Sequence, residues 1–246
     1  MESVSDFFLN VSKLFDASSL LTALPIENID RYEAKSNFVL QSNTSVELGG
    51  KNASSALLSL YSAEEVSSDE IRLIGQNLPD LQNQQINFGV VIRFLGNQIN
   101  DELFYILSQN IKRLLQIKGL MLKGCDSEIW CRISQDTFAE GLTFQKWGSI
   151  FLSRLHQEFP EIKSCQILFI SGASNEFNLL SDLVQKQTQY LKLLKSRVWE
   201  SRGYSFKDCH VLGHCGQCSD KKLCANVRKM ERIVQVTRKV NQKGIE

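Results

Sequence analysis

The 246-residue sequence has no long apolar run: nowhere do about 18 apolar residues follow one another, the length that a membrane helix needs. Its first ten residues, MESVSDFFLN, also lack the basic-then-apolar pattern of a secretory signal. We therefore expect a cytoplasmic protein without a membrane span. With 43% apolar residues the chain can build a core. Its composition is not that of a disordered protein.

Recognisable catalytic motifs are absent too. No Ser-His-Asp set, paired-carboxylate motif or P-loop stands out, and there is no internal repeat or low-complexity tract. We therefore predict no catalytic residue, and we do not expect the chain to catalyse a reaction alone.

Neither sign of charge dominates, since the formal net charge is only +1, but the two signs are separated along the chain. Residues 181–246 hold 14 Lys and Arg against 6 Asp and Glu, whereas the rest of the chain holds 14 against 21. Such a basic segment suits an anionic partner: nucleic acid, a phosphate-bearing cofactor or an acidic protein face. Solvated helix faces that balance an acidic body explain the same pattern.

Four of the seven cysteines stand close together in the stretch CHVLGHCGQCSDKKLC. They follow the spacing Cys-x5-Cys-x2-Cys-x5-Cys and are Cys209, Cys215, Cys218 and Cys224. Cytoplasmic thiols stay reduced, so clustered cysteines there are more often metal ligands than disulfides. Four thiolates can hold either zinc in a tetrahedron or a [4Fe–4S] cluster, and this spacing fits no standard pattern of either kind. We predict a metal site at these four cysteines.

Three further cysteines and one histidine favour structural roles. Cys165 lies in an apolar, strand-like run and is predicted to be a small core residue. Cys125 and Cys131 fall on the turn and the second strand of a predicted hairpin, where we expect a structural role rather than a ligand role. His156 lies in the middle of a predicted helix and is interpreted as a surface histidine or one with satisfied hydrogen bonds.

The central part of the chain alternates between β-rich and helical patterns. Read in order, a strand, a helix, two strands, a helix and a strand are predicted at residues 87–96, 102–117, 119–124, 128–134, 143–159 and 165–172. This β-α-β-β-α-β order is the split pattern of a ferredoxin-like sandwich. We therefore predict an α+β fold in which two helices cover one face of an antiparallel sheet, followed by a helical, Cys-rich metal module.

Four parts are expected along the chain. They are an N-terminal helix and irregular arm (1–44), an α+β domain (45–175), a connecting helix (176–202) and a Cys-cluster module with a closing helix (203–246).

Trp130 and Arg132 alternate with Cys131, so they should share one face of their strand. A functional interpretation is a cofactor-binding surface, with Arg132 on a phosphate and Trp130 stacked on an adenine. A packed tryptophan beside a surface arginine is the structural alternative.

A family resemblance emerges from the ordered series SVELGG (45–50), IRLIGQNL (71–78), FGVVIRFLG (88–96) and the long stretch 118–162. Within that stretch Trp130, Arg132, Gly141, Phe144 and Phe159-Pro160 carry the likeness. The series resembles the middle domain of the acetyl-CoA synthase beta subunit, part of the carbon monoxide dehydrogenase/acetyl-CoA synthase complex. About half of the chain is covered.

The resemblance implies contacts with coenzyme A in this domain, and in that family a separate C-terminal domain holds a nickel–iron–sulfur cluster through a Cys-Gly-Cys motif. These 246 residues contain no such tripeptide, and Met121 stands where the family has a tryptophan. The spacing of the four clustered cysteines also differs from the family's, so the nickel site is not transferred to them. The likeness to an oxygen-sensitive, anaerobic enzyme system favours [4Fe–4S] over zinc for the cysteine cluster.

Three hypotheses follow. The first is an iron–sulfur accessory protein of the carbon monoxide dehydrogenase/acetyl-CoA synthase system, acting in electron transfer, assembly or regulation, with subunits of that complex or another redox protein as partners. The second is a divergent subunit of the CO-methylating acetyl-CoA synthase itself. The third is a zinc-stabilised protein that binds nucleic acid or an acidic partner through its basic segment.

Overall fold

A computed structural model describes Phe15 and residues 21–28, 38–50, 53–63, 68–81, 84–124, 127–172 and 175–202. The first compact unit ends at Leu194, inside the last helix described, and the account below concerns that unit. The predicted Cys-cluster module with its closing helix (203–246) lies outside the described residues, as does the predicted N-terminal helix apart from Phe15. The predicted division into four parts stays a prediction.

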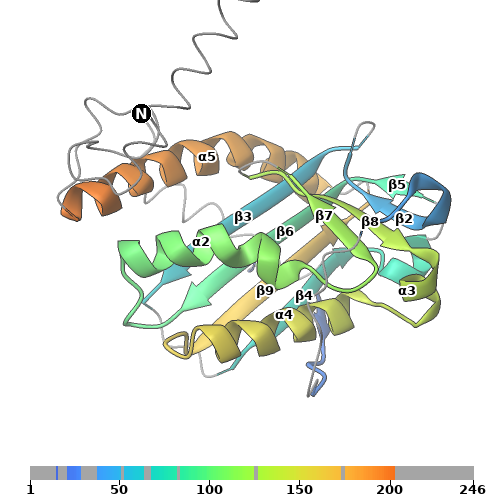
Figure 1. Ribbon diagram of the computed structural model, residues 1–246, viewed down its shortest axis with the longest axis horizontal. Helices are drawn as coiled ribbons and strands as arrows, with labels where there is room; N and C mark the ends of the chain where they lie inside the picture. Colours follow the sequence, from blue (N-terminus) through green and yellow to red (C-terminus); the bar gives the residue numbers. More distant parts are fainter. Residues whose placement is uncertain are drawn as a thin grey trace, which may run out of the picture. The chain divides into compact units, whose positions relative to one another are not determined.

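A mixed five-stranded sheet forms the centre of the fold (Figure 1). Its strands, in spatial order, are β1 (Thr22–Leu24), β4 (Glu70–Gly75), β9 (Ser164–Ser171), β6 (Phe88–Leu95) and β3 (Ser55–Ser62). The pairs β4–β9 and β3–β6 are parallel, whereas β6–β9 and β1–β4 are antiparallel. The two central strands, β9 and β6, are almost wholly buried, as expected for strands covered on both faces.

A second, smaller sheet carries the hairpin of the central sequence pattern. Its strands, in spatial order, are β5 (Gln85–Ile86), β2 (Thr44–Leu48), β8 (Trp130–Ser134) and β7 (Leu120–Lys123). One face is apolar and fully buried through Val46, Leu48, Cys131 and Ile133. The alternate residues of β2 and β8 lie on the other face, because side chains alternate along a strand.

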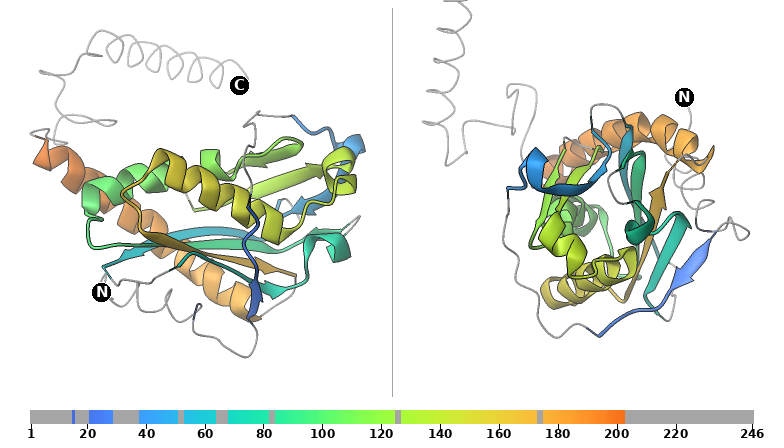
Figure 2. Two further views of the ribbon diagram at one scale, coloured as in Figure 1. Left: turned by 90° about the horizontal axis from the view of Figure 1, so that it is seen from below. Right: turned by 90° about the vertical axis from the view of Figure 1, so that its right-hand side faces the viewer.

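Two long helices cover one face of the five-stranded sheet (Figures 1 and 2). They are α2 (Asp101–Leu115) and α4 (Phe144–Glu158), and both begin at side-chain caps, Asn100 and Thr143. A short helix, α3 (Gln135–Ala139), follows β8. Helix α2 buries Phe104, Leu107, Ile111, Leu114 and Leu115, at the spacing of an amphipathic helix. Ile106, which the sequence pattern places on the same apolar face, is exposed instead.

Helix α5 (Asn175–Ser201) covers the opposite face of the sheet (Figure 2). Its residues Phe177, Leu180 and Leu183 share an apolar cluster with β3, β6 and β9. Farther along, the Gln187 side chain donates to the Ser59 hydroxyl of β3 at 3.2 Å. The helix thereby also covers β3, the edge strand that would otherwise offer unpaired backbone groups.

The α+β class is confirmed, but the ferredoxin-like strand pairing is not the one observed. All six predicted elements form in order as β6, α2, β7, β8, α4 and β9, yet they divide between two sheets. In a ferredoxin-like sheet, the second hairpin strand lies beside the first strand. Here β3 occupies that edge of β6 along its whole length, from Ser55↔Phe88 to Ser62↔Leu95. The hairpin strand β8 pairs with β2 instead.

Among the described residues, no helix is both long enough and apolar enough to cross a membrane. Strand β1 lies within the stretch 16–44, for which an irregular arm is expected, and pairs with β4 from Thr22↔Leu73 to Leu24↔Ile71.

Candidate binding pocket

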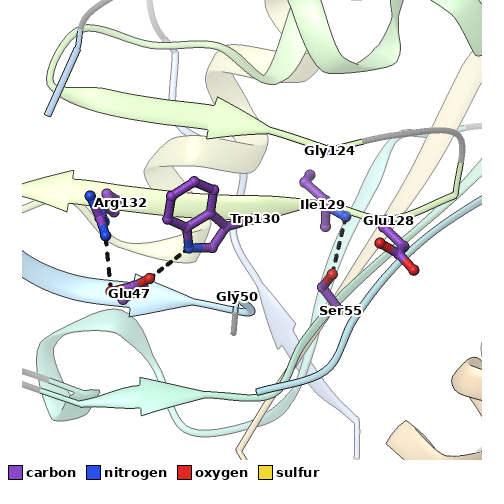
Figure 3. A pocket seen from close by; sticks show the side chains of 8 residues that line it. All are labelled: Glu47, Gly50, Ser55, Gly124, Glu128, Ile129, Trp130 and Arg132. Carbon is purple, nitrogen blue, oxygen red and sulfur yellow. Dashed lines mark hydrogen bonds and ion pairs between the residues drawn. The ribbon is translucent and has the colours of Figure 1, made fainter. Parts of the chain in front are cut away.

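A pocket of about 440 Å³ opens on the smaller sheet, where β2, β8 and the start of β3 meet (Figure 3). Its volume falls in the usual range for small-molecule sites. The lining residues are Glu47, Gly50, Ser55, Gly124, Glu128, Ile129, Trp130 and Arg132. Both predicted binding residues, Trp130 and Arg132, therefore belong to one concave site.

Three side chains at this site contact one another (Figure 3). The Trp130 indole Nε1 donates to Glu47 Oε1 at 2.7 Å, and Arg132 Nε lies 3.6 Å from Glu47 Oε2. The Arg132 guanidinium carbon also stacks 4.7 Å from the centre of the Trp130 ring, within cation–π range. Glu47 therefore fixes the indole and balances the charge of Arg132.

Strand register explains why these residues meet. Glu47 of β2 stands directly opposite Arg132 of β8, so the two side chains share the outer face of the sheet. Trp130 lies two residues before Arg132 and shares that face, which confirms the geometry expected from alternation. Met121 of β7 is the cross-strand neighbour of Arg132 on the other side and is 4% exposed.

The turn Gly49-Gly50 leaves space beside the indole. Both glycines have positive φ angles, +70° and +108°, as a tight turn requires. A Cβ on Gly50 would lie 2.7 Å from Trp130 Nε1 and 2.9 Å from Gln85 Nε2. Any other residue at position 50 would therefore displace the indole or the Gln85 amide.

Sequence reasoning finds Trp130 and Arg132 but misses Glu47, Ser55 and Glu128. Glu47 lies more than eighty residues from Arg132, so only strand pairing reveals the contact. One signal was available: a single carboxylate interrupts the apolar strand run SVEL and marks its outward face.

The lining offers limited positive charge to the phosphate groups of coenzyme A. Arg132 is its one cation, and Glu47 Oε2 lies 3.6 Å from Arg132 Nε, which is buried without a hydrogen-bond partner. Glu128 adds a second carboxylate, and the Trp130 N–H is already bonded. A cofactor-binding role for Trp130 and Arg132 stays a prediction.

Other reactive side chains lie in inert surroundings. Cys131 and Cys165 are fully buried free cysteines, and burial raises the pKa of both thiols. Cys165 is thus the core residue that its strand predicted. His156 Nε2 lies 2.8 and 3.0 Å from the two Asp69 carboxylate oxygens, so it is a satisfied histidine.

Within the ranges that the structure describes, no group of three or more His, Cys, Asp or Glu residues could hold a metal ion. The predicted ligands Cys209, Cys215, Cys218 and Cys224, and also Cys125, lie outside those ranges. The metal site therefore stays a prediction from the sequence.

The described unit is an α+β domain with a pocket on its smaller sheet. The sequence model of the CO dehydrogenase/acetyl-CoA synthase complex beta subunit matches residues 24–175, which are more than half of the chain. The chain belongs to this family, as the resemblance predicted.

Individual relatives are distant and much longer. The acetyl-CoA decarbonylase/synthase complex subunit beta 1 of Methanocaldococcus jannaschii is 22% identical over 155 residues, which cover 62% of this chain and 20% of the relative. The carbon monoxide dehydrogenase/acetyl-CoA synthase subunit alpha of Moorella thermoacetica is 25% identical over 142 residues, or 56% of this chain and 19% of the relative. The complex subunit beta of Methanopyrus kandleri is 21% identical over 204 residues, or 80% of this chain and 41% of the relative. This chain therefore aligns with less than half the length of each.

Proposed function

We propose that this protein is an accessory protein of a carbon monoxide dehydrogenase/acetyl-CoA synthase system, acting in electron transfer, assembly or regulation. Family membership over residues 24–175 is the observation that carries the proposal, since the named relatives are subunits of such complexes.

The proposed cofactor is a [4Fe–4S] cluster held by Cys209, Cys215, Cys218 and Cys224. Two observations support this cofactor. The four thiols stand close together in the sequence, and Cys131 and Cys165 are fully buried in the core, where a cluster has no room. Four thiolates are the usual ligand set of such a cluster. An electron-handling or sensing role would follow from its redox chemistry.

The first experiment is metal and sulfide analysis with a visible spectrum, on protein purified without oxygen. The expected result is about four iron and four sulfide per chain with broad absorbance near ~400 nm. A Cys215→Ser/Cys218→Ser variant should lose the iron, whereas a Cys165→Ala variant should retain it, because Cys165 is a core residue. One zinc and no colour would instead favour a structural zinc site.

A second experiment tests the partner. Tagged protein is isolated anaerobically from its own cells, and bound chains are identified by mass spectrometry. Capture of carbon monoxide dehydrogenase/acetyl-CoA synthase subunits is expected, with no nickel in the chain itself. Nickel-dependent acetyl or CO exchange by the isolated chain would contradict the accessory role.

Family membership equally supports a second candidate, a divergent synthase subunit that works with a separate chain holding the nickel cluster. A reconstitution experiment distinguishes the subunit role from the accessory role. If synthase activity of the captured complex disappears when this chain is removed and returns when it is added back, the subunit role is favoured over the accessory role.

A further inference from the structure

The five-stranded sheet carries a polar row on the face that α5 packs against. Glu70, Gln166 and Arg93 stand opposite one another on β4, β9 and β6. The Gln166 side chain accepts a hydrogen bond from Arg93 Nε at 2.5 Å and donates one to Glu70 Oε2 at 3.0 Å. Glu70 also pairs with Arg72, the next residue of β4 on this face, at 2.6 Å. Gln166 is only 3% exposed, so the row is covered at its centre.

Phe15 lies on this face and anchors the N-terminal part of the chain there. Its side chain is 1% exposed and belongs to the apolar cluster that α5 forms with the sheet. The ring centre lies 5.1 Å from the Arg93 guanidinium carbon, within cation–π range. The Phe15 backbone carbonyl accepts a hydrogen bond from Arg72 Nη1. Two arginines from different strands thus hold one aromatic residue by its ring and by its main chain.

The other attachments of the N-terminal part are slight. Strand β1 pairs with β4 over three residues, from Thr22↔Leu73 to Leu24↔Ile71, and its first two residues are exposed. Beyond it, the Glu27 backbone N–H donates to the Ser149 hydroxyl of α4 at 2.9 Å. We call Phe15 and residues 21–28 the N-terminal strap. Its hold on the domain depends mainly on one buried side chain and a few backbone hydrogen bonds.

The strap fills a surface with the properties of a peptide-binding site. An exposed sheet edge binds an extended peptide through main-chain hydrogen bonds, and a nearby side-chain socket supplies the specificity. Here the edge of β4 lies beside the socket formed by Arg72 and Arg93. The family model matches residues 24–175, so the matched region includes β4 but neither Phe15 nor the first two residues of β1.

We propose that this corner of the sheet is a peptide-binding site and that the strap is its built-in, exchangeable ligand. The site selects an extended peptide with an aromatic anchor, whose ring packs against Arg93 and whose carbonyl meets Arg72. A tethered ligand has an effective concentration of about a millimolar, so a strap that binds at about 10 µM when separate fills about 99% of the sites. The strap therefore blocks the site until a competing protein segment displaces it.

This inference goes beyond the accessory role, and its test uses the purified full-length chain whatever its metal content. A protease recognition sequence of equal length replaces residues 31–37, and the folded chain is then cut. A dye on the N-terminus reports by fluorescence anisotropy whether the cleaved segment stays bound. The expected result is reversible release on dilution, with a dissociation constant of about 10 µM, while the domain keeps a cooperative thermal transition. A segment that leaves only when the domain unfolds would overturn the proposal.

Competitor peptides test the anchor without changing the domain. A peptide of residues 9–28 should displace the dyed segment from the cleaved protein. The Phe15→Ala peptide should do so at least about tenfold less well, because it lacks the side chain that is buried in the core. The Ile26→Ala peptide is the matched control and should compete fully, since Ile26 is 47% exposed. Equal competition by all three peptides would contradict the proposal.

Two arginine variants of the cleaved chain test the socket. Arg72→Met removes the donor to the Phe15 carbonyl and should weaken rebinding about fivefold. Arg113→Met is the control, because Arg113 lies on α2 and pairs with Glu158 of α4, and it should leave rebinding unchanged. Equal rebinding by both variants would exclude Arg72 from recognition and contradict the proposed socket.

The size of the cleaved domain distinguishes the possible occupants. If the domain forms dimers once the strap has left, excess peptide of residues 9–28 should dissociate them, which would identify a second copy as a competitor for the same site. Dimers that persist in excess peptide would place the newly exposed surface elsewhere and would contradict the blocking role of the strap.

Discussion

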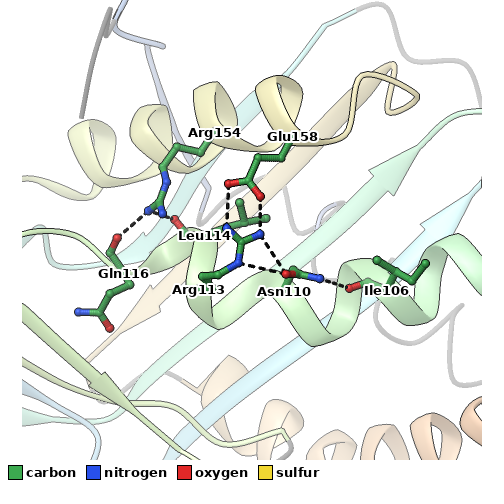
Figure 4. A network of polar contacts seen from close by, with 7 residues as sticks. All are labelled: Ile106, Asn110, Arg113, Leu114, Gln116, Arg154 and Glu158. Atoms are coloured by element: carbon green, nitrogen blue, oxygen red, sulfur yellow. Dashed lines mark hydrogen bonds and ion pairs between the residues drawn. The ribbon is translucent and has the colours of Figure 1, made fainter. Parts of the chain in front are cut away.

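Arg154 of helix α4 donates a hydrogen bond to the backbone carbonyl of Leu114, at the last turn of helix α2, over 2.8 Å (Figure 4). The same Nη1 atom donates to the carbonyl of Gln116 at 2.6 Å. The last carbonyls of a helix have no partner within the helix, so a side chain from a neighbouring element must satisfy them when they are buried. Arg154, which is only 8% exposed, links the two helices in this way.

Replacing Arg154 with Met should destabilise the protein substantially. The variant retains the buried aliphatic stem but loses the charged donor, so two carbonyls lose their partner. We expect a loss of about 3 kcal/mol in the free energy of unfolding, measured by urea denaturation. Arg113→Met serves as the control: Arg113 pairs with Glu158 but is half-exposed, so its loss should cost at most about 1 kcal/mol. Equal effects of the two variants would contradict the prediction.

The His156–Asp69 pair should make stability depend on pH. The hydrogen bond that His156 donates to the Asp69 carboxylate is the largest cause that raises the pKa of His156, and partial burial opposes it. A raised folded-state pKa means that the stabilisation is complete below the unfolded-state pKa of about 6.5 and is lost as pH rises through the folded-state value.

The measurement is the difference in unfolding free energy between the wild type and His156→Gln across this range. The wild-type advantage should be largest near about pH 6 and should shrink toward about pH 9. A difference that stays constant with pH would show that the charge of His156 is irrelevant to stability.

Gly50→Ala should lower the free energy of unfolding by more than the cost of placing an alanine at a positive φ angle, and it should also disturb the pocket. Position 50 has a φ of +108°, and the new Cβ would meet the Trp130 indole at 2.7 Å. Gly141→Ala is the matched control, because Gly141 also has a positive φ, +76°, but a Cβ there meets nothing within 4 Å. The control should cost about 1 kcal/mol. Gly50→Ala should cost more and should also shift the Trp130 indole resonance, which the control leaves in place.

Cys131 and Cys165 should resist alkylation in the folded protein. Both are fully buried, and burial raises the pKa of each thiol, so the reactive thiolate is scarce. Iodoacetamide at about pH 8 should leave their peptides unmodified in the native protein and modify them in urea, as read by mass spectrometry. Labelling of either residue under native conditions would contradict the burial described above.

Local patterns in the sequence predicted most of the elements. The helical patterns expected at 102–117 and 143–159 place α2 and α4 within two residues of their observed ends. Strand pairing was the part that local patterns could not supply. Strand β3, with the sequence SALLSLYS, was not predicted as a strand, although its parallel pairing with β6 decides how the hairpin is placed.

In the candidate site, too, local patterns in the sequence predict the faces of one strand but not the pairing between strands. Alternation along one strand predicted that Trp130 and Arg132 share a face, and the pocket confirms it. Glu47, which also lines the pocket, comes from another strand. Without the register between β2 and β8, the contact of Arg132 with Glu47 could not be predicted.

The position of β4 between β1 and β9 has a consequence for the order of events during synthesis. Strand β4 leaves the ribosome before its long parallel partner β9, which is paired with it from Glu70↔Gln166 to Gly75↔Ser171 and is made 96 residues later. Until then Ile71 and Ile74 lack most of the neighbours that bury them in the finished sheet. The nascent chain must therefore wait for Ser164–Ser171 before its central sheet can close, and chains interrupted earlier should be targets for chaperones and proteases.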